Sequence, residues 1–106
     1  MPKYMLIGSY TAEGAKGLLK EGGSARHEAG KAAIESAGGT LESYYFGFGT
    51  DDYYVIADFP DHATAAGFAL TVGATGTQNL RTIVLLTPEE LDAASQKSVS
   101  FRPPGG

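Results

Sequence analysis

The sequence contains no cysteine, and this absence excludes several kinds of site. A chain without cysteine has no disulfide framework, no thiolate nucleophile and no Cys-based zinc, haem-thiolate or iron–sulfur site. We therefore expect neither a metal nor a cofactor of those kinds, and the composition fits a reducing compartment.

Long apolar runs and clusters of basic residues are also lacking. No stretch approaches the roughly 18 apolar residues of a membrane span, and residues 1–7 combine a short apolar run with no basic start and no cleavage-like site. The eight Lys and Arg residues are scattered, and the formal net charge is -4. Electrostatic binding to nucleic acid or to an anionic membrane is therefore not expected. We expect a cytoplasmic protein without partners of either kind.

The length of 106 residues and the hydrophobic content of 42% suit a single domain with a modest core. The 15 glycines fall mostly at junctions between expected elements, as in a compact fold with tight turns. We assign residues 1–98 to this domain. Residues 99–106 end in Arg-Pro-Pro-Gly-Gly and are expected to form a flexible tail.

Four segments are rich in aromatic and β-branched residues and predict strands: 3–10, 40–48, 53–59 and 79–86. The segment 49–52, Gly-Thr-Asp-Asp, predicts a hairpin turn between the second and third strands.

Helices are predicted between these strands from their capping residues. Thr11 caps a helix that runs through Lys20, and Ser24 caps a second stretch that runs to about Ala37 on a face of small residues. Asp61 caps a helix with a buried stripe that ends between Gly73 and Gly76. A capping box at 87–90 starts a last helix towards Lys97. The predicted fold class is α+β: a ferredoxin-like βαββαβ domain with a four-stranded antiparallel sheet and helices on one face.

The expected sheet has apolar residues at consecutive positions, such as 55–57 and 83–86, where a half-solvated sheet would alternate. The face without helices therefore needs a cover. A second copy of the same sheet is the simplest one in so short a chain, so we expect a homodimer or a higher homo-oligomer. The alternative is that the terminal helix from Glu89 folds back over this face.

The segments 49–61, 65–70 and 76–82, together with 11–14 and 38–41, resemble the GYD-domain family in content and order. The resemblance covers about residues 3–91. It departs at the motif that names the family, where Gly49 and Asp52 match but Asp51 stands where tyrosine is usual. The resemblance implies a ferredoxin-like domain of the dimeric α/β-barrel type that oligomerises and has no agreed biochemical activity.

The candidates for chemistry are Arg26, His27, Tyr44 and Asp52. A neutral imidazole can act as a general base or ligate haem or a metal, but no second ligand stands at suitable spacing beside His27. The pair Asp51 and Asp52 suits either a carboxylate site or, as expected at a hairpin, local bonds to backbone N–H groups.

Other charged residues have structural interpretations. His62 follows a helix cap and is expected to be exposed and inert. Asp58 ends an apolar row, where it is expected at the rim or beside a cation, and a direct contact with Arg81 is not expected within one subunit.

Tyrosine and phenylalanine are concentrated on the first three expected strands. These rings suit cross-strand packing, or a chamber in which hydroxyls bind a small apolar or aromatic ligand. Two functions follow. The first is a small-molecule-binding or assembly module whose interior is shared between subunits. The second is a cofactor-free enzyme of the monooxygenase, isomerase or decarboxylase type in an intersubunit cavity. Haem binding through His27 is a third hypothesis.

Overall fold

The computed structural model describes all 106 residues and contains the four strands and four helices that the sequence predicts. In chain order they are β1 (Lys3–Tyr10), α1 (Ala12–Glu21), α2 (Gly23–Ser36), β2 (Thr40–Phe46), β3 (Tyr53–Asp58), α3 (His62–Ala74), β4 (Gln78–Leu85) and α4 (Pro88–Ser95). None of these helices combines the length and the apolar character that crossing a bilayer requires.

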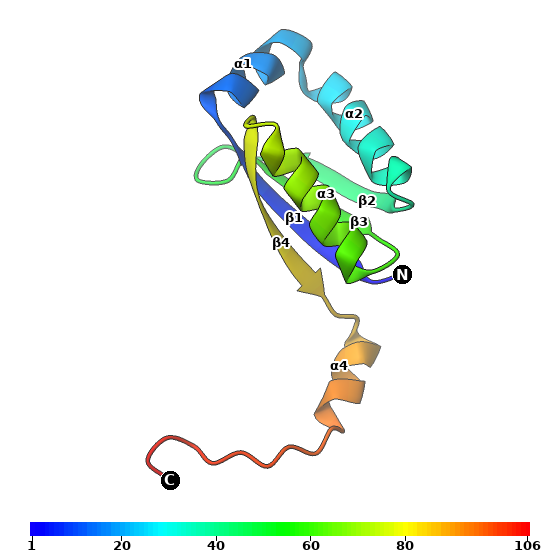
Figure 1. Cartoon of the computed structure of the whole chain (residues 1–106), viewed down its shortest axis with the longest axis vertical. Coiled ribbons are helices and arrows are strands. Elements are labelled where there is room, and N and C mark those ends of the chain that lie inside the picture. Colours follow the sequence, from blue (N-terminus) through cyan, green and yellow to red (C-terminus); the bar gives the residue numbers. More distant parts are fainter.

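The four strands form one sheet in the order β2-β3-β1-β4, and each neighbouring pair is antiparallel. Helices α2 and α3 lie on the same side of this sheet, α2 over β2 and α3 over β4 (Figure 1). The predicted ferredoxin-like α+β fold with helices on one face is therefore confirmed.

Three of the predicted helix caps are present. The side chains of Thr11 and Asp61 accept hydrogen bonds from backbone N–H groups three positions along, and Thr87 forms the full capping box. The predicted cap at Ser24 is wrong, because α2 already begins at Gly23 and follows α1 with only Gly22 between them. Gly22 has a φ of 84°, a conformation that glycine adopts without strain, and this permits the immediate turn.

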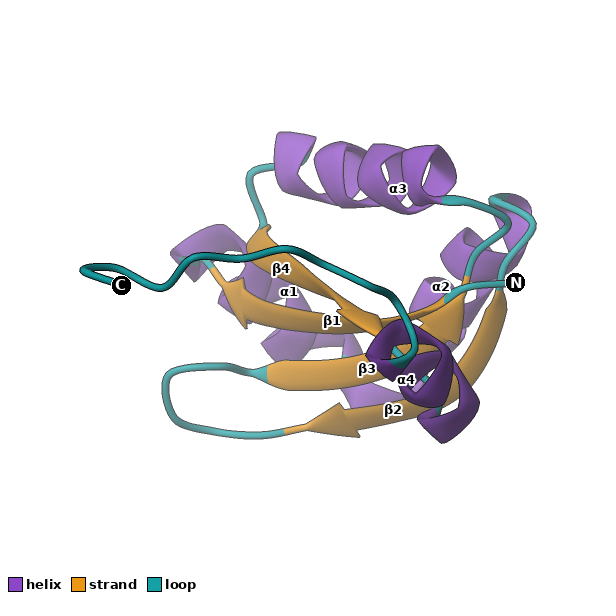
Figure 2. Ribbon diagram, turned by 90° about the horizontal axis from the view of Figure 1, so that it is seen from below, coloured by secondary structure: helices purple, strands orange, loops and turns teal.

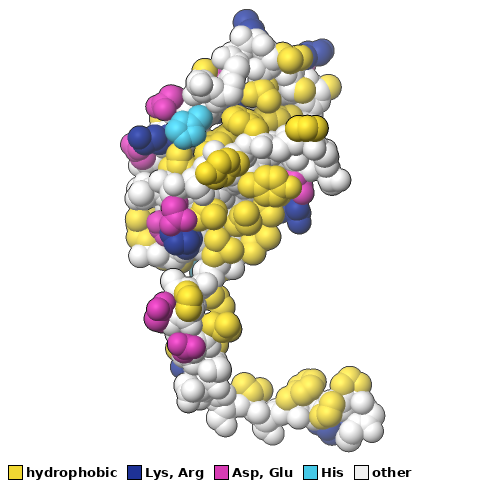
Figure 3. Space-filling model, turned by 180° about the vertical axis from the view of Figure 1, so that it is seen from behind, with side chains coloured by type: hydrophobic (Ala, Val, Ile, Leu, Met, Phe, Trp, Pro, Cys, Tyr) yellow, Lys and Arg dark blue, Asp and Glu magenta, His cyan; other side chains and the backbone are white.

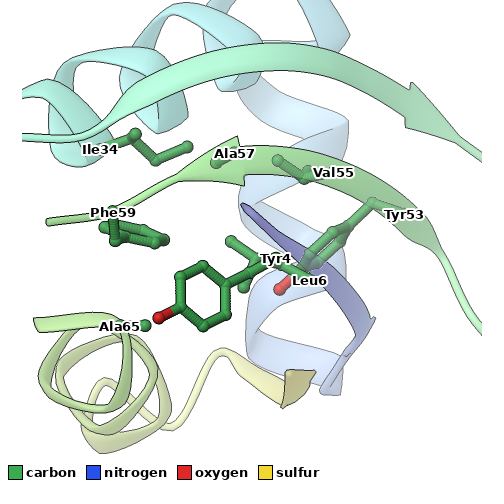
Figure 4. Close-up of a cluster of buried hydrophobic side chains, with 8 residues drawn as sticks. All are labelled: Tyr4, Leu6, Ile34, Tyr53, Val55, Ala57, Phe59 and Ala65. Carbon is green, nitrogen blue, oxygen red and sulfur yellow. The ribbon is translucent and has the colours of Figure 1, made fainter. Parts of the chain in front are cut away.

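The core lies between the sheet and the helices (Figure 4). Its buried members are Tyr4, Leu6, Ile34, Tyr53, Val55, Ala57, Phe59 and Ala65. On the central strands these are alternate residues that stand opposite each other, since Tyr4 pairs with Ala57 and Leu6 with Val55. The register thus decides which alternating set faces the helices, a point that the sequence pattern leaves open.

The other alternating set forms what we call the outer face of the sheet. It comprises Met5, Ile7, Tyr45, Tyr54, Ile56, Ile83 and Leu85. These apolar side chains make a patch on the side away from the helices (Figure 3), and Tyr45 is 70% exposed. The sheet therefore has apolar residues on both sides, as predicted.

Ion pairs lie at both ends of the outer face. At one end the Lys3 Nζ is 2.7 Å from Glu42 Oε1 and 3.1 Å from Asp58 Oδ1. At the other end Arg81 Nη2 is 3.1 Å from Asp51 Oδ2. Asp58 is thus paired with a cation as expected, and the partner of Arg81 is the hairpin carboxylate of the same chain.

Residues 86–106, which we call the C-terminal arm, leave the end of β4 and point away from the sheet (Figures 1 and 2). They extend the molecule to 56 Å along its longest axis. Helix α4 does not fold back over the outer face, so that alternative is wrong. The helix is short, and Leu91 is its one large apolar side chain, so it has little to bury against a sheet. Residues 97–106 contain neither helix nor strand.

Only glycine fits at position 8, because the side chain of Tyr53 occupies the space above it. Gly8 pairs with Tyr53, and a Cβ added at Gly8 would overlap the ring of Tyr53. We expect Gly8→Ala to lower the free energy of unfolding by about 1–3 kcal/mol, measured by urea denaturation, because the ring must move within a packed core. Gly17→Ala is the control, since a Cβ there meets nothing within 4 Å and alanine favours the helix by up to about 1 kcal/mol. Equal stability of Gly8→Ala and the wild type would contradict this account.

Candidate functional site

A cavity of about 60 Å³ lies between the sheet and the two covering helices. Its walls are mostly apolar. They come from the sheet through Leu6, Tyr44, Tyr53, Val55, Gln78 and Leu80, and from the helices through Arg26, Gly30, Ala33, Ile34, Phe68 and Val72. Helix α2 packs on β2 and helix α3 packs on β4. The central strands β1 and β3 are therefore covered by side chains from both helices and have no helix directly above them.

The small residues of α2 determine how close this helix comes to the sheet. A Cβ added at Gly30 would lie 2.9 Å from Cε2 of Tyr44, which is tighter than an ordinary contact. Gly30 therefore lets the ring of Tyr44 lie beneath the helix and form one wall of the cavity. The small-residue face predicted for this helix has this function.

Tyrosine hydroxyls gather at one end of the cavity. The Tyr53 hydroxyl donates to Oε1 of Gln78 at 2.7 Å. The ring of Tyr53 lies 5.5 Å from that of Tyr10 and 6.3 Å from that of Tyr44, between their centroids. The hydroxyl of Tyr10 is buried and has no hydrogen-bond partner. An unpartnered buried hydroxyl is costly, although the Tyr44 hydroxyl is near enough to act on its pKa. Tyr10 therefore adds a polar atom next to the ring of Tyr53, which lines the cavity.

Burial controls the ionisation of these phenols. It raises the pKa of Tyr53 to about 12. Burial, followed by the nearby Tyr44 hydroxyl, also raises the pKa of Tyr10. Burial raises the pKa of Tyr44 as well, and the Tyr10 hydroxyl and the Arg26 charge partly offset it. At neutral pH all three are neutral hydroxyls that donate and accept hydrogen bonds.

Arg26 supplies a positive charge at the edge of the cavity. Its Nη1 is 3.5 Å from Oε1 of Glu21, and its side chain is partly exposed. A single long ion pair of this kind stabilises a surface by little and leaves the guanidinium free to turn towards an anionic or oxygen-bearing group.

His27 lies next to Arg26 in sequence but outside the cavity. It borders a shallow depression with Gly23, Ser24 and Phe46. Its Nδ1 is 3.3 Å from Glu28 Oε1, and its ring meets that of Tyr44 edge to face at 5.3 Å. No group of three or more His, Asp or Glu side chains that could hold a metal ion occurs in the structure.

The two hairpin carboxylates do not converge. Asp52 Oδ2 accepts from the backbone N–H of Tyr10 at 2.8 Å, while Asp51 pairs with Arg81. Asp52 also joins the strands through its own N–H, which donates to the carbonyl of Gly8 at 2.7 Å. Asp52 therefore positions Tyr10, and the two aspartates share no pocket.

The other histidine has a structural partner. His62 is exposed as predicted, yet its Nδ1 lies 2.5 Å from the hydroxyl of Tyr4, a residue that is only 1% exposed. His62 therefore satisfies the polar atom of a core tyrosine, a structural role that the sequence did not indicate.

The structure brings together only part of the predicted set. Arg26 and Tyr44 line the cavity, Asp52 acts through Tyr10, and His27 stays outside. The cavity lies on the helix side of the sheet, whereas the sequence placed the shared interior on the outer face. Gln78 was missed, because a polar residue at the start of a strand is typical of a turn.

Replacing the Tyr53 hydroxyl tests how the phenols are held. An unfolded tyrosine titrates near pH 10. Below about pH 10 the folded and the unfolded protein both keep the phenol proton, so Tyr53 does not make the free energy of unfolding depend on pH there. Between about pH 10 and 12 only the folded state keeps it, since its pKa is about 12, and the free energy of unfolding falls with rising pH.

We expect Tyr53→Phe to make this alkaline fall shallower in urea unfolding experiments. At pH 7 the variant loses about 1 kcal/mol, because the hydrogen bond to Gln78 is gone. Tyr45→Phe removes a hydroxyl from an exposed ring and is expected to leave the stability at pH 7 unchanged. An identical alkaline slope in Tyr53→Phe and the wild type would show that Tyr53 is not buried as described.

Comparison with known proteins places the chain in a family. The family model described as GYD domain matches residues 4–95, from β1 to the last residue of α4. No curated protein matches the chain, and no solved structure does. The chain therefore belongs to the GYD domain family.

Proposed function

We propose that this GYD domain is a small-molecule-binding module whose ligand occupies the cavity between the sheet and the helices. The observation that carries the proposal is a cavity whose apolar walls also hold Arg26, Tyr44 and Tyr53, with the buried hydroxyl of Tyr10 next to the ring of Tyr53. Binding sites for small molecules combine such walls with a few converging polar groups. The ligand that fits is apolar or aromatic and carries an oxygen atom that faces the tyrosines.

The size of the cavity limits how such a ligand binds. A volume of about 60 Å³ is smaller than that of an engineered cavity of roughly 150 Å³ that binds benzene. A ring therefore enters only if the cavity widens. The Arg26 side chain is partly exposed, and α2 and α3 rest on different strands. The two helices can therefore move apart without breaking the sheet.

The alternative is a cofactor-free enzyme that uses the same residues. A general base in the cavity would need to lose its proton near neutral pH, yet burial raises the pKa values of Tyr10, Tyr44 and Tyr53. His27, the residue best suited to proton transfer, lies outside the cavity. These observations favour binding over monooxygenase, isomerase or decarboxylase chemistry, and over haem ligation by His27.

Phenol and benzene are the probes for the binding proposal. Titrated into the isotope-labelled protein, phenol is expected to shift the NMR signals of Gln78 and Leu80 with a dissociation constant of roughly 1–10 mM, as suits so small a ligand. Tyr10→Phe is expected to weaken phenol binding about five- to tenfold through the loss of one hydrogen bond. It should leave benzene binding unchanged and keep or slightly raise the stability of the free protein, because the buried hydroxyl has no partner there.

Val72→Phe is the matched test of location. It fills the cavity from α3 and is expected to abolish the shifts, whereas Leu70→Phe alters an exposed position of the same helix and is expected to preserve them. Shifts that survive Val72→Phe in a folded protein would place the ligand elsewhere and overturn the proposal.

The outer face supports a second function, assembly with copies of the same chain. Apolar side chains from all four strands of the sheet are gathered there with ion pairs only at the two ends (Figure 3). Exposed apolar patches of this kind typically mark interaction sites. A second outer face is the natural cover, since both surfaces are then flat, apolar and self-complementary.

We expect sedimentation velocity at micromolar concentration to show a dimer or a larger assembly. Ile56→Asp places a carboxylate in the middle of the outer face, and it is expected to yield a monomer because a buried unpaired charge is strongly disfavoured. Leu70→Asp introduces the same charge on the solvent side of α3 and should leave the assembly intact. A wild-type protein that sediments only as the single chain would contradict the proposed association through the outer face.

A further inference from the structure

The outer face is small for a stable interface. Four strands spaced by about 4.8 Å, each about 7 residues long at about 3.3 Å per residue, give a surface of roughly 450 Å² per copy. The two flat outlines add up to roughly 900 Å², and the uneven side-chain surface brings the accessible area that they bury towards the lower end of the 1,200–2,000 Å² of stable interfaces. Association through the sheets alone would therefore make a small interface that further contacts would strengthen.

The C-terminal arm carries the kind of surface that adds such contacts. Leu86, Leu91, Val99 and Phe101 are all more than half exposed, and Phe101 is 76% exposed. Its helix α4 is already formed, with a capping box and Pro88 at its start. This helix points away from the sheet and helices of its own domain (Figure 1). An ordered segment with exposed apolar residues gains stability only when it packs on another surface.

The arm also begins at the right place and is long enough. It follows Leu85, which pairs with Lys3 and belongs to the outer face itself. From Leu86 to Phe101, eight helical residues at about 1.5 Å and eight extended residues at about 3.3 Å reach up to about 38 Å. This length exceeds the sheet width of roughly 19 Å that four strands give. The arm of one copy can therefore reach across the sheet of a copy placed against its outer face.

We infer that the partner of the arm is a second copy of this chain, whose outer-face rim it covers so that arm and sheet together complete one interface. The inference rests on the proposed association through the outer face. It assigns to residues 86–101 an intermolecular role that neither the sheet nor the cavity requires.

The arm variant Val99→Asp/Phe101→Asp tests the energetic part in the full chain. We expect its dissociation constant in sedimentation experiments to rise at least about tenfold over the wild type, while Leu70→Asp leaves it unchanged. The variant should keep the wild-type circular dichroism, because both residues lie outside the core. An unchanged dissociation constant would overturn the inference, and Ile56→Asp would show whether association through the sheet still holds.

The absence of cysteine permits a direct test of which copy receives the arm. A nitroxide attached to Ser98→Cys in unlabelled protein is mixed with isotope-labelled protein without the nitroxide. We expect broadening of the NMR signals of Met5, Ile7 and Ile83 on the outer face, and sharp signals for Leu70 on α3. Broadening only when both labels are on the same chain would mean that the arm folds onto its own sheet. A dimer without broadening would also overturn the inference, and a wild-type monomer would overturn the association as well.

Discussion

The contact between Gly8 and Tyr53 is the constraint on which the rest of the domain depends. A glycine on β1 leaves space on the helix side of the sheet, and the Tyr53 ring of β3 fills it. The rings of Tyr10 and Tyr44 both pack beside this ring, so the group of tyrosines at the cavity exists because one central position has no side chain. The register that pairs these residues also sends the remaining apolar set to the outer face.

The two sides of the sheet consequently differ in character. On the helix side, apolar walls enclose neutral hydroxyls and face a cation at the edge, an arrangement suited to holding a small molecule. On the outer side, a flat apolar patch is bounded by charges, an arrangement suited to another protein surface. One strand pair, β1 with β3, supplies residues to both, so the cavity and the outer face are built on the same backbone.

Much of this architecture could be predicted from local signals. Periodicity and capping residues such as Thr11, Asp61 and Thr87 identified the elements, and consecutive apolar residues in 55–57 indicated a sheet that is apolar on both sides. The location of the cavity could not be predicted in this way. It depends on strand register and on which helix rests on which strand, and these bring together Arg26, Tyr44 and Gln78 from distant parts of the chain. The start of α2 was missed because Gly22 makes a turn that needs no side-chain cap.

The two adjacent aspartates in the hairpin between β2 and β3 bond to different parts of the molecule. Asp52 bonds the backbone of Tyr10, while Asp51 bonds Arg81 at the end of the outer face. A single peptide unit thus connects the strand that forms the cavity with the border of the outer face. Position 51 is therefore a natural point of divergence in this hairpin, because a change there alters the charge pattern at the border of the outer face and spares the hydrogen bond beneath it.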